Sequence, residues 1–201
     1  MDHKILLEII KRKIKDENVV WLIKKILNNF ETSKINKGMP LGNLTSQFFA
    51  NICLNELDRF VKNKLKARYY IRYVDDFIIL NNNKENLKEY KNKITKYLNY
   101  LKLELHPDKT KILPLSNGTT FLGYKIFYQY KLLKKKNIKK FNQNFKAKLK
   151  LYKKMQCSSN NILSSLEGWL GYAKWANTYK IQRKRNRVIT LHQITNPNKN
   201  F

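Results

Sequence analysis

The sequence predicts an α+β fold in which a mixed half of helices and strands is followed by a basic, helical half. Apolar residues recur every three or four positions over several long segments, which is the spacing of amphipathic helices. Short runs rich in Tyr, Ile and Val stand on both sides of Asp75-Asp76, as in antiparallel strands. After residue 130 lysine-dense helical patterns take over, in a chain whose 201 residues suffice for one sizeable core or two small ones.

Residues 1–66 are predicted to contain three helices. Asp2 is a candidate N-cap of the first, and Asp16-Glu17-Asn18 begins the second. Between the second and third helices, residues 31–42 read as a loop that ends in a constrained turn. The third helix, residues 43–66, has a broad apolar face and is therefore expected to lie beneath the sheet.

Asp75 and Asp76 stand inside an apolar, aromatic stretch where packing residues are expected. Neighbouring side chains of a strand point to opposite faces, so both acids can serve one site only if the chain turns there. A strand–Asp-Asp–strand hairpin would place both carboxylates at its tip, where they repel each other unless a proton or a cation intervenes. Hard divalent cations such as Mg²⁺ prefer carboxylate oxygen. The alternative is a surface turn rich in Asp, which is common.

Another amphipathic helix is expected over residues 87–101, with its lysines on the outside. Residues 110–113 and 120–128 are predicted strands, and Asn117-Gly118 between them is a hairpin-turn signal.

The basic half is predicted to contain two helices, at residues 138–152 and 162–173, the second capped at Ser158-Ser159-Asn160. The expected division of the chain has three parts: residues 1–130, residues 131–190 and a flexible tail at residues 191–201.

The charge of the chain indicates a polyanionic partner. Lys and Arg number 42 against 14 Asp and Glu, which gives a formal net charge of +28, an excess that is costly in self-repulsion. Tyrosines interleaved with basic residues suit stacking on bases beside phosphate contacts, so RNA or DNA is the leading partner. A membrane surface is not favoured, because the basic residues are spread along the chain rather than confined to one amphipathic helix. The alternative for the charge is a coding bias toward Lys and Asn.

Cys53 and Cys157 are isolated and have neither metal-site nor redox spacing, so a cytoplasmic location is expected. The three histidines form no ligand motif, and no apolar run approaches the length of a membrane span.

Four motifs in order resemble the second half of a reverse transcriptase palm followed by its thumb. They are the segment from Gly38 to Gln47, Tyr73-Val74-Asp75-Asp76, the segment from Leu103 to Lys111, and Phe121-Leu122-Gly123-Tyr124. The stretch from Leu166 to Tyr172 is similar to thumbs of the bacterial branch, which includes group II intron, retron and diversity-generating enzymes. The resemblance implies a partial right-hand polymerase palm, residues 1–130, and an α-helical thumb, residues 131–190, with the fingers absent.

The resemblance also implies roles for particular residues. Asp75 and Asp76 would bind two Mg²⁺ ions, for which Mn²⁺ can substitute, and Lys109 would assist catalysis while Lys111 contacts phosphate. Template and nucleotide would be bound by Gly42, Asn43, Ser46, Gln47 and Tyr73, and the primer would be gripped by Phe121, Leu122 and Gly123. The alternatives are solvated lysines, an ordinary helix cap at Ser46 and Gln47, and a plain core strand at residues 121–123.

The implied reaction is RNA-directed DNA synthesis, with an RNA template, a DNA or RNA primer and dNTP as partners. A small basic accessory protein is a further partner that the resemblance suggests. Leu41 before Gly42 and Gln47 after Ser46 are similar to the diversity-generating type. The family's first catalytic Asp and its fingers would lie upstream of Met1, so weak or absent activity is expected of this chain, with Asp2 only a cap. The rival functions are a catalytically defective, maturase-like RNA-binding protein and a basic architectural protein.

Overall fold

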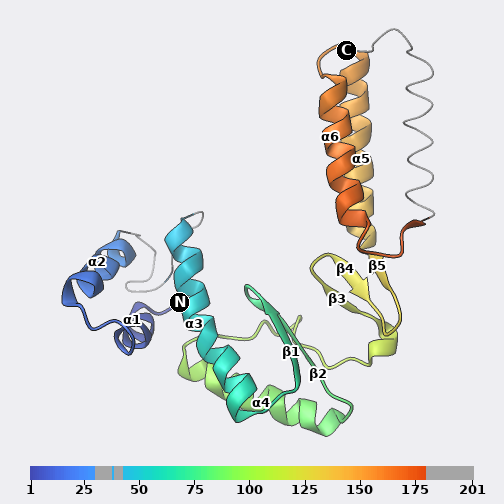
Figure 1. The fold of residues 1–201 in the computed structure, drawn as a ribbon. Helices are drawn as coiled ribbons and strands as arrows, with labels where there is room; N and C mark the ends of the chain where they lie inside the picture. Colours follow the sequence, from blue (N-terminus) through green and yellow to red (C-terminus); the bar gives the residue numbers. More distant parts are fainter. Residues whose placement is uncertain (30–37, 39–42, 180–201) are drawn as a thin grey trace. The chain divides into compact units, whose positions relative to one another are not determined.

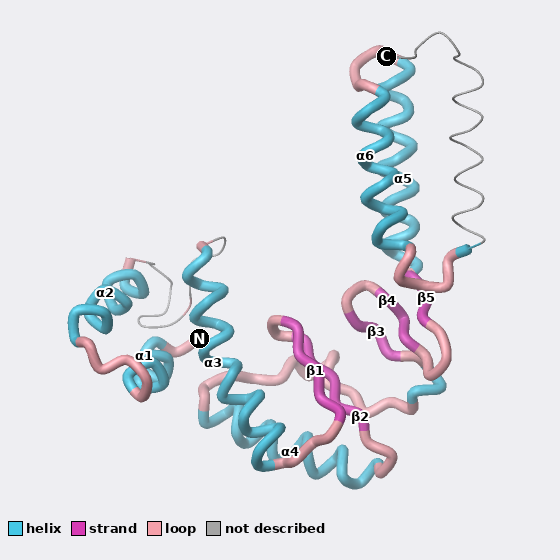
Figure 2. Tube along the Cα trace, viewed as in Figure 1, coloured by secondary structure: helices cyan, strands magenta, loops and turns pink. Residues whose placement is uncertain are grey.

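A computed structural model describes residues 1–29, 38 and 43–179, which divide between Ile112 and Leu113 into two compact units (Figure 1). Helices dominate both units, and the strands form two small antiparallel sheets (Figure 2). This is the mixed fold that the sequence predicts, and it is consistent with a partial polymerase palm. Among the described residues, none of the helices combines the length and the hydropathy of a membrane-spanning segment.

The two N-terminal helices begin where the sequence predicts. Helix α1, His3–Lys11, is capped by Asp2, whose Oδ1 accepts hydrogen bonds from the backbone N–H groups of Lys4 and Ile5 at 3.1 and 3.2 Å. Helix α2, Glu17–Asn28, is capped in the same way by Asp16. Each cap satisfies N–H groups that have no partner within the helix.

Helix α3, Leu44–Arg59, continues into the π-helical turn η1, Phe60–Lys64, so the predicted third helix is confirmed. The chain then forms the hairpin of β1, Tyr69–Tyr73, and β2, Asp76–Leu80. Helix α4, Lys84–Tyr100, completes the first unit and is capped by Asn83.

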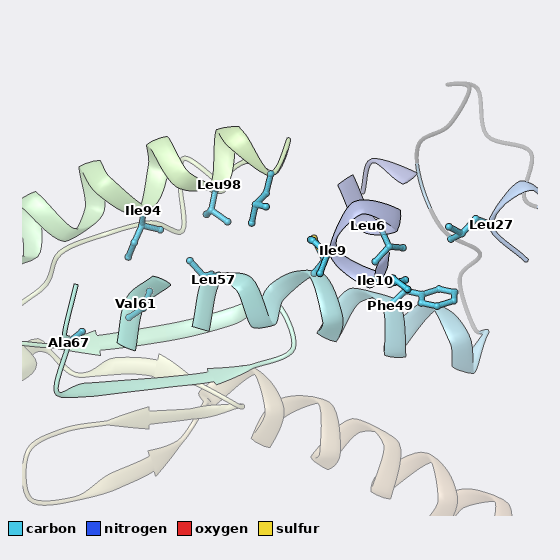
Figure 3. Close-up of a cluster of buried hydrophobic side chains, with 12 residues drawn as sticks. Leu6, Ile9, Ile10, Leu27, Phe49, Leu57, Val61, Ala67, Ile94 and Leu98 are labelled. Atoms are coloured by element: carbon cyan, nitrogen blue, oxygen red, sulfur yellow. The ribbon is translucent and has the colours of Figure 1, made fainter. Parts of the chain in front are cut away.

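The core of the first unit lies between α1, α3, η1 and α4. Figure 3 shows Leu57 and Val61 directed toward Ile94 and Leu98 of α4. Nearer the N-terminus of α3, Phe49 belongs to the same cluster. So do three residues of α1: Leu6, Ile9 and Ile10.

The β1–β2 hairpin rests on this core by one face, as expected from its alternation. Tyr70, Phe77 and Ile79 pack against the core, whereas Tyr69 and Ile71 face away and are exposed. The third helix therefore lies beneath the sheet, as predicted from its broad apolar face.

The second unit begins with the 3₁₀ turn η2, Leu115–Asn117, and a three-stranded sheet in the order β3-β4-β5. The strands are β3, Thr119–Phe121, β4, Tyr124–Ile126, and β5, Lys131–Leu133. Helices α5, Lys135–Lys153, and α6, Ser159–Ala173, follow, and Ser158 caps α6 as predicted.

Two strand predictions in this region are wrong. The single strand expected at residues 120–128 is two strands, because Leu122 and Gly123 turn the chain with φ values of 49° and 85°. Positive φ at both central residues is the geometry of a tight two-residue hairpin turn, which Gly favours. Residues 110–113 are not in a strand either.

A small core joins this sheet to the helices. Leu133 of β5, Trp169 and Ala173 are buried together, and the ring of Phe141 stacks on that of Trp169 at a centroid distance of 4.6 Å. The sheet thus shares a compact unit with the helices, and the unit begins earlier in the chain than the border expected near residue 130. Division into palm and thumb remains a prediction, and the expected tail at residues 191–201 lies outside the described residues.

Candidate active site

The Asp-Asp pair lies at the tip of the β1–β2 hairpin, as the sequence predicts. Strand pairing runs from Tyr69 opposite Leu80 to Tyr73 opposite Asp76, which leaves Val74 and Asp75 as the two turn residues. Both carboxylate side chains are exposed to solvent. Two adjacent acids therefore share one exposed turn.

Val74 has an unusual backbone conformation for its residue type. Its φ of 54° lies in the left-handed region, where a β-branched residue is a genuine outlier. Such a conformation costs about 1–3 kcal/mol and persists only where surrounding contacts hold it. The turn that carries the acids is therefore held in place from outside.

Arg72 supplies one of the contacts that hold the turn. Its Nη1 donates a 2.7 Å hydrogen bond to the carbonyl oxygen of Val74 and a 3.2 Å bond to Oδ1 of Asn51 on α3. Its Nε and Nη2 donate to Oδ1 and Oδ2 of Asp58 at 2.8 and 2.7 Å. The guanidinium is thus bound to helix α3 and to the turn at once.

The hydroxyl of Tyr70 donates a further hydrogen bond of 2.6 Å to Oδ1 of Asp58. Burial by itself raises the pKa of Asp58, but hydrogen bonds from Arg72 and Tyr70 and the charge of Arg72 outweigh it, so the pKa of this carboxyl is lowered. Burial and the neighbouring carboxylate raise the pKa of Tyr70. The cluster therefore holds a carboxylate, a guanidinium and a neutral phenol at neutral pH.

Asp75 and Asp76 supply some of the ligands that a hard divalent cation prefers. Carboxylate oxygens on an exposed turn suit Mg²⁺, which also takes water and substrate phosphate oxygens as ligands. Within residues 1–29, 38 and 43–179, no group of three or more His, Cys, Asp or Glu side chains could hold a metal ion. The turn thus offers two carboxylates, and further ligands would have to come from elsewhere.

The predicted template and nucleotide residues lie at the beginning of α3, except for Gly42, which is outside the described residues. Asn43 is the N-cap, and its Oδ1 accepts hydrogen bonds from the backbone N–H and hydroxyl of Thr45 at 3.1 and 2.9 Å. Gln47 is exposed. Ser46 is 8% exposed, and its hydroxyl has no hydrogen-bond partner among the described residues. Helix capping therefore accounts for Asn43, and capping is the alternative to a role in template or nucleotide binding at this helix start.

Tyr73 ends β1 beside the acids and is 58% exposed. Lys109 and Lys111 lie beyond α4, are exposed and make no ion pair with a described residue. Tyr73 is thus adjacent to the acids, whereas nothing in the described hydrogen bonds or ion pairs joins either lysine to them.

The predicted primer-grip residues form the end of the β3–β4 hairpin in the second unit. Phe121 is buried, whereas Leu122 is exposed in the turn. The backbone oxygen of Gly123 accepts hydrogen bonds from the hydroxyl of Tyr172 and the N–H of Lys134, each at 3.0 Å. The residue that closely approaches the Gly123 backbone in the structure is Tyr172 of α6.

The sequence reasoning missed Arg72 and its partner Asp58. The signal that could have found Arg72 is the alternation of β1, in which residue 72 shares a face with Tyr70 and lies opposite Phe77. A charged residue on the packed face of a strand requires a partner. The partner, Asp58, belongs to α3, and the two residues meet only when the hairpin packs on that helix.

Comparison with known proteins matches residues 1–126 to the family described as reverse transcriptase (RNA-dependent DNA polymerase). A palm-like α+β unit with two acids on a hairpin turn fits this class of nucleic-acid polymerase. The chain belongs to the reverse transcriptase family, whose members generally use divalent metal ions.

Two curated relatives are similar to the chain. The group II intron-encoded protein LtrA of Lactococcus lactis subsp. cremoris is 28% identical, over 63% of this chain and 32% of LtrA. Protein YkfC of Escherichia coli is 26% identical, over 62% of this chain and 42% of YkfC. The chain therefore spans less than half the length of either relative.

Proposed function

We propose that this chain carries part of the active site of an RNA-directed DNA polymerase that copies an RNA template by nucleotidyl transfer. The observation that supports this most is the position of Asp75 and Asp76 at the exposed tip of a hairpin inside the region that matches the family. A basic architectural protein would have no use for such a pair.

In this proposal Asp75 and Asp76 hold two Mg²⁺ ions, which when bound supply positive charge beside the primer hydroxyl and the leaving pyrophosphate. Lys109 donates a proton to the leaving group, and Lys111 contacts phosphate. The beginning of α3, with Asn43, Ser46 and Gln47 next to Gly42, contacts template and nucleotide together with Tyr73. The exposed turn at Leu122 and Gly123, with Phe121 behind it, contacts the primer, and residues 131–190 act as a thumb.

The charge of the chain supports RNA and primer as partners. A net charge of +28 favours phosphate contacts, and the helix α5 carries many exposed lysines, among them Lys139, Lys140, Lys146 and Lys150. A small basic accessory protein and a cytoplasmic location belong to the same proposal.

Manganese binding tests the metal site most directly. Electron paramagnetic resonance should detect Mn²⁺ bound to the chain, and the double substitution Asp75→Ala, Asp76→Ala should abolish that binding. Asp108→Ala is the matched control, because Asp108 is an exposed acid of the same unit outside the hairpin. Binding that survives the double substitution would refute the metal site.

Primer extension on an RNA template with dNTP, in Mg²⁺ and in Mn²⁺, tests the reaction itself. We expect weak or absent synthesis by this chain alone, with any synthesis lost on Asp75→Ala, because the hairpin turn offers only two carboxylates. Misincorporation opposite template adenines would support the diversity-generating type that Leu41 and Gln47 favour, and faithful copying would oppose it.

A second candidate function is a catalytically defective RNA-binding protein of the palm–thumb type. The observation that favours it is that, among the described residues, no group of three or more His, Cys, Asp or Glu side chains could hold a metal ion. Tight RNA binding that is independent of Asp75, without any synthesis, would support this candidate over the polymerase.

A further inference from the structure

The packed face of β1 carries a charged residue where an apolar one is expected. The side chain of Arg72 is only 13% exposed, and its partner Asp58 is 28% exposed. Burying such a pair costs solvation that a hydrophobic pair would not, so stability alone is weak grounds for an ion pair here. The contacts of Arg72 indicate another use.

Arg72 contacts the peptide group that leads directly into Asp75. The carbonyl of Val74 and the N–H of Asp75 belong to one planar peptide unit. A hydrogen bond of 2.7 Å to the Val74 oxygen therefore fixes the orientation of the peptide group that joins Val74 to Asp75. The same contact opposes relaxation of the unfavourable Val74 conformation, whose φ is 54°.

The guanidinium of Arg72 is itself held by two side chains of helix α3. Asn51 and Asp58 are seven residues apart on α3, which places them two turns apart on one face. Asp58 receives two parallel hydrogen bonds, a geometry that the planar guanidinium matches and a lysine ammonium does not. Arg72 therefore cannot tilt without breaking several bonds at once.

We propose that Arg72 is a positioning residue, which fixes the Asp75-Asp76 turn to helix α3 and thereby sets the direction of the metal-binding carboxylates. It does not touch the metal or substrate itself. Ser46 and Gln47 lie in the first turn of the same helix, so the metal-binding turn and the proposed template contacts are held by one element. This inference rests on the proposed function of the turn.

The test is the substitution Arg72→Lys, which keeps the charge beside Asp58 but cannot also reach Val74 and Asn51. We expect the variant to fold and to bind RNA with unchanged affinity, while its Mn²⁺ affinity falls by about tenfold, as is usual when a residue that supports a metal ligand is changed. Arg68→Lys is the matched control, since Arg68 is exposed and lies over the ring of Tyr69, which pairs with Leu80 at the opposite end of the hairpin from the turn. It should leave the Mn²⁺ affinity unchanged.

Asp58→Asn serves as a second variant if Arg72→Lys does not fold, because it keeps the size of the side chain and one acceptor oxygen. It too should weaken Mn²⁺ binding while RNA affinity stays unchanged. If either folded variant binds Mn²⁺ as the unmodified chain does, while the double substitution Asp75→Ala, Asp76→Ala abolishes binding, the positioning role is refuted and the proposed function stands. If the double substitution Asp75→Ala, Asp76→Ala leaves Mn²⁺ binding intact, the proposed function fails and the positioning role fails with it.

Discussion

The hydroxyl of Tyr172 on α6 lies 3.0 Å from the backbone oxygen of Gly123 and donates a hydrogen bond to it. The same hydroxyl accepts a 3.1 Å hydrogen bond from the side-chain amide of Asn137 on α5. The turn between β3 and β4 is thereby joined to both helices of the second unit. A side chain at residue 123 would have to displace these groups.

Gly123→Ala should destabilise the second unit by about 1–3 kcal/mol. A Cβ there would lie 2.5 Å from the Tyr172 hydroxyl and 2.8 Å from the Asn137 amide, and the φ of 85° is unfavourable for Ala. Chemical denaturation followed by tryptophan fluorescence measures the effect. Gly171→Ala is the control, because nothing lies within 4 Å of its added Cβ in α6, and it should stabilise by about 0.5–1 kcal/mol. Equal effects of the two substitutions would contradict the prediction.

Val74→Gly should be more stable than Val74→Ala by about 1 kcal/mol. Glycine ordinarily destabilises a folded chain relative to alanine, so this reversed order is diagnostic of a positive φ. Thermal unfolding of the two variants, measured side by side, decides it. An alanine variant as stable as the glycine variant would show that the turn relaxes in solution.

Asp2→Ala should cost about 1–2 kcal/mol, because it removes the cap of α1. It also removes a 2.7 Å ion pair with Lys102. Lys102→Met separates the two contributions, since it removes only the ion pair, whose lysine is half-exposed, and should cost no more than about 1 kcal/mol. Urea denaturation of both variants provides the comparison. A larger loss for Lys102→Met than for Asp2→Ala would contradict the capping role.

The free energy of unfolding should fall as the pH drops below about 4, the ordinary pKa range of Asp. The pKa values of Asp2 and Asp58 are lowered in the folded chain: burial acts to raise both, and hydrogen bonds and nearby cations outweigh it. The unfolded state therefore takes up protons first, and the stabilisation present at higher pH is lost as pH falls through the folded pKa values. Unfolding followed from pH 6 to pH 3 tests this. Asp58→Asn should show a smaller loss over that range, and an identical loss would exclude Asp58 as a contributor.

RNA affinity should fall steeply with salt, by an amount that depends on the lysines of α5. Replacing Lys139 and Lys146 by Gln should reduce the slope of log affinity against log salt by roughly 0.7–0.9 for each lost phosphate contact. Lys88 and Lys93 on α4 are the matched control, because they pair with Glu85 and Glu89. Fluorescence anisotropy with labelled RNA at several salt concentrations gives the slope. A flat salt dependence would contradict binding through phosphates.

The sequence alone predicts the start of α1 at Asp2, the start of α6 at Ser158 and the hairpin that carries Asp75 and Asp76. These features are decided by residues a few positions apart, through side-chain caps and through alternation along a strand. The match to the reverse transcriptase family confirms the resemblance that the motifs imply. The diversity-generating type stays a prediction.

The tertiary structure decides what lies between distant segments. The local pattern predicts one strand across Leu122 and Gly123, because a Leu-Gly pair within an apolar run does not by itself indicate a turn. The pairing of Arg72 with Asp58 joins residues on a strand and a helix, and it exists only because the hairpin packs one face on α3. Local pattern fixes which face of a strand a residue occupies, whereas the partner it meets there depends on packing of the whole unit.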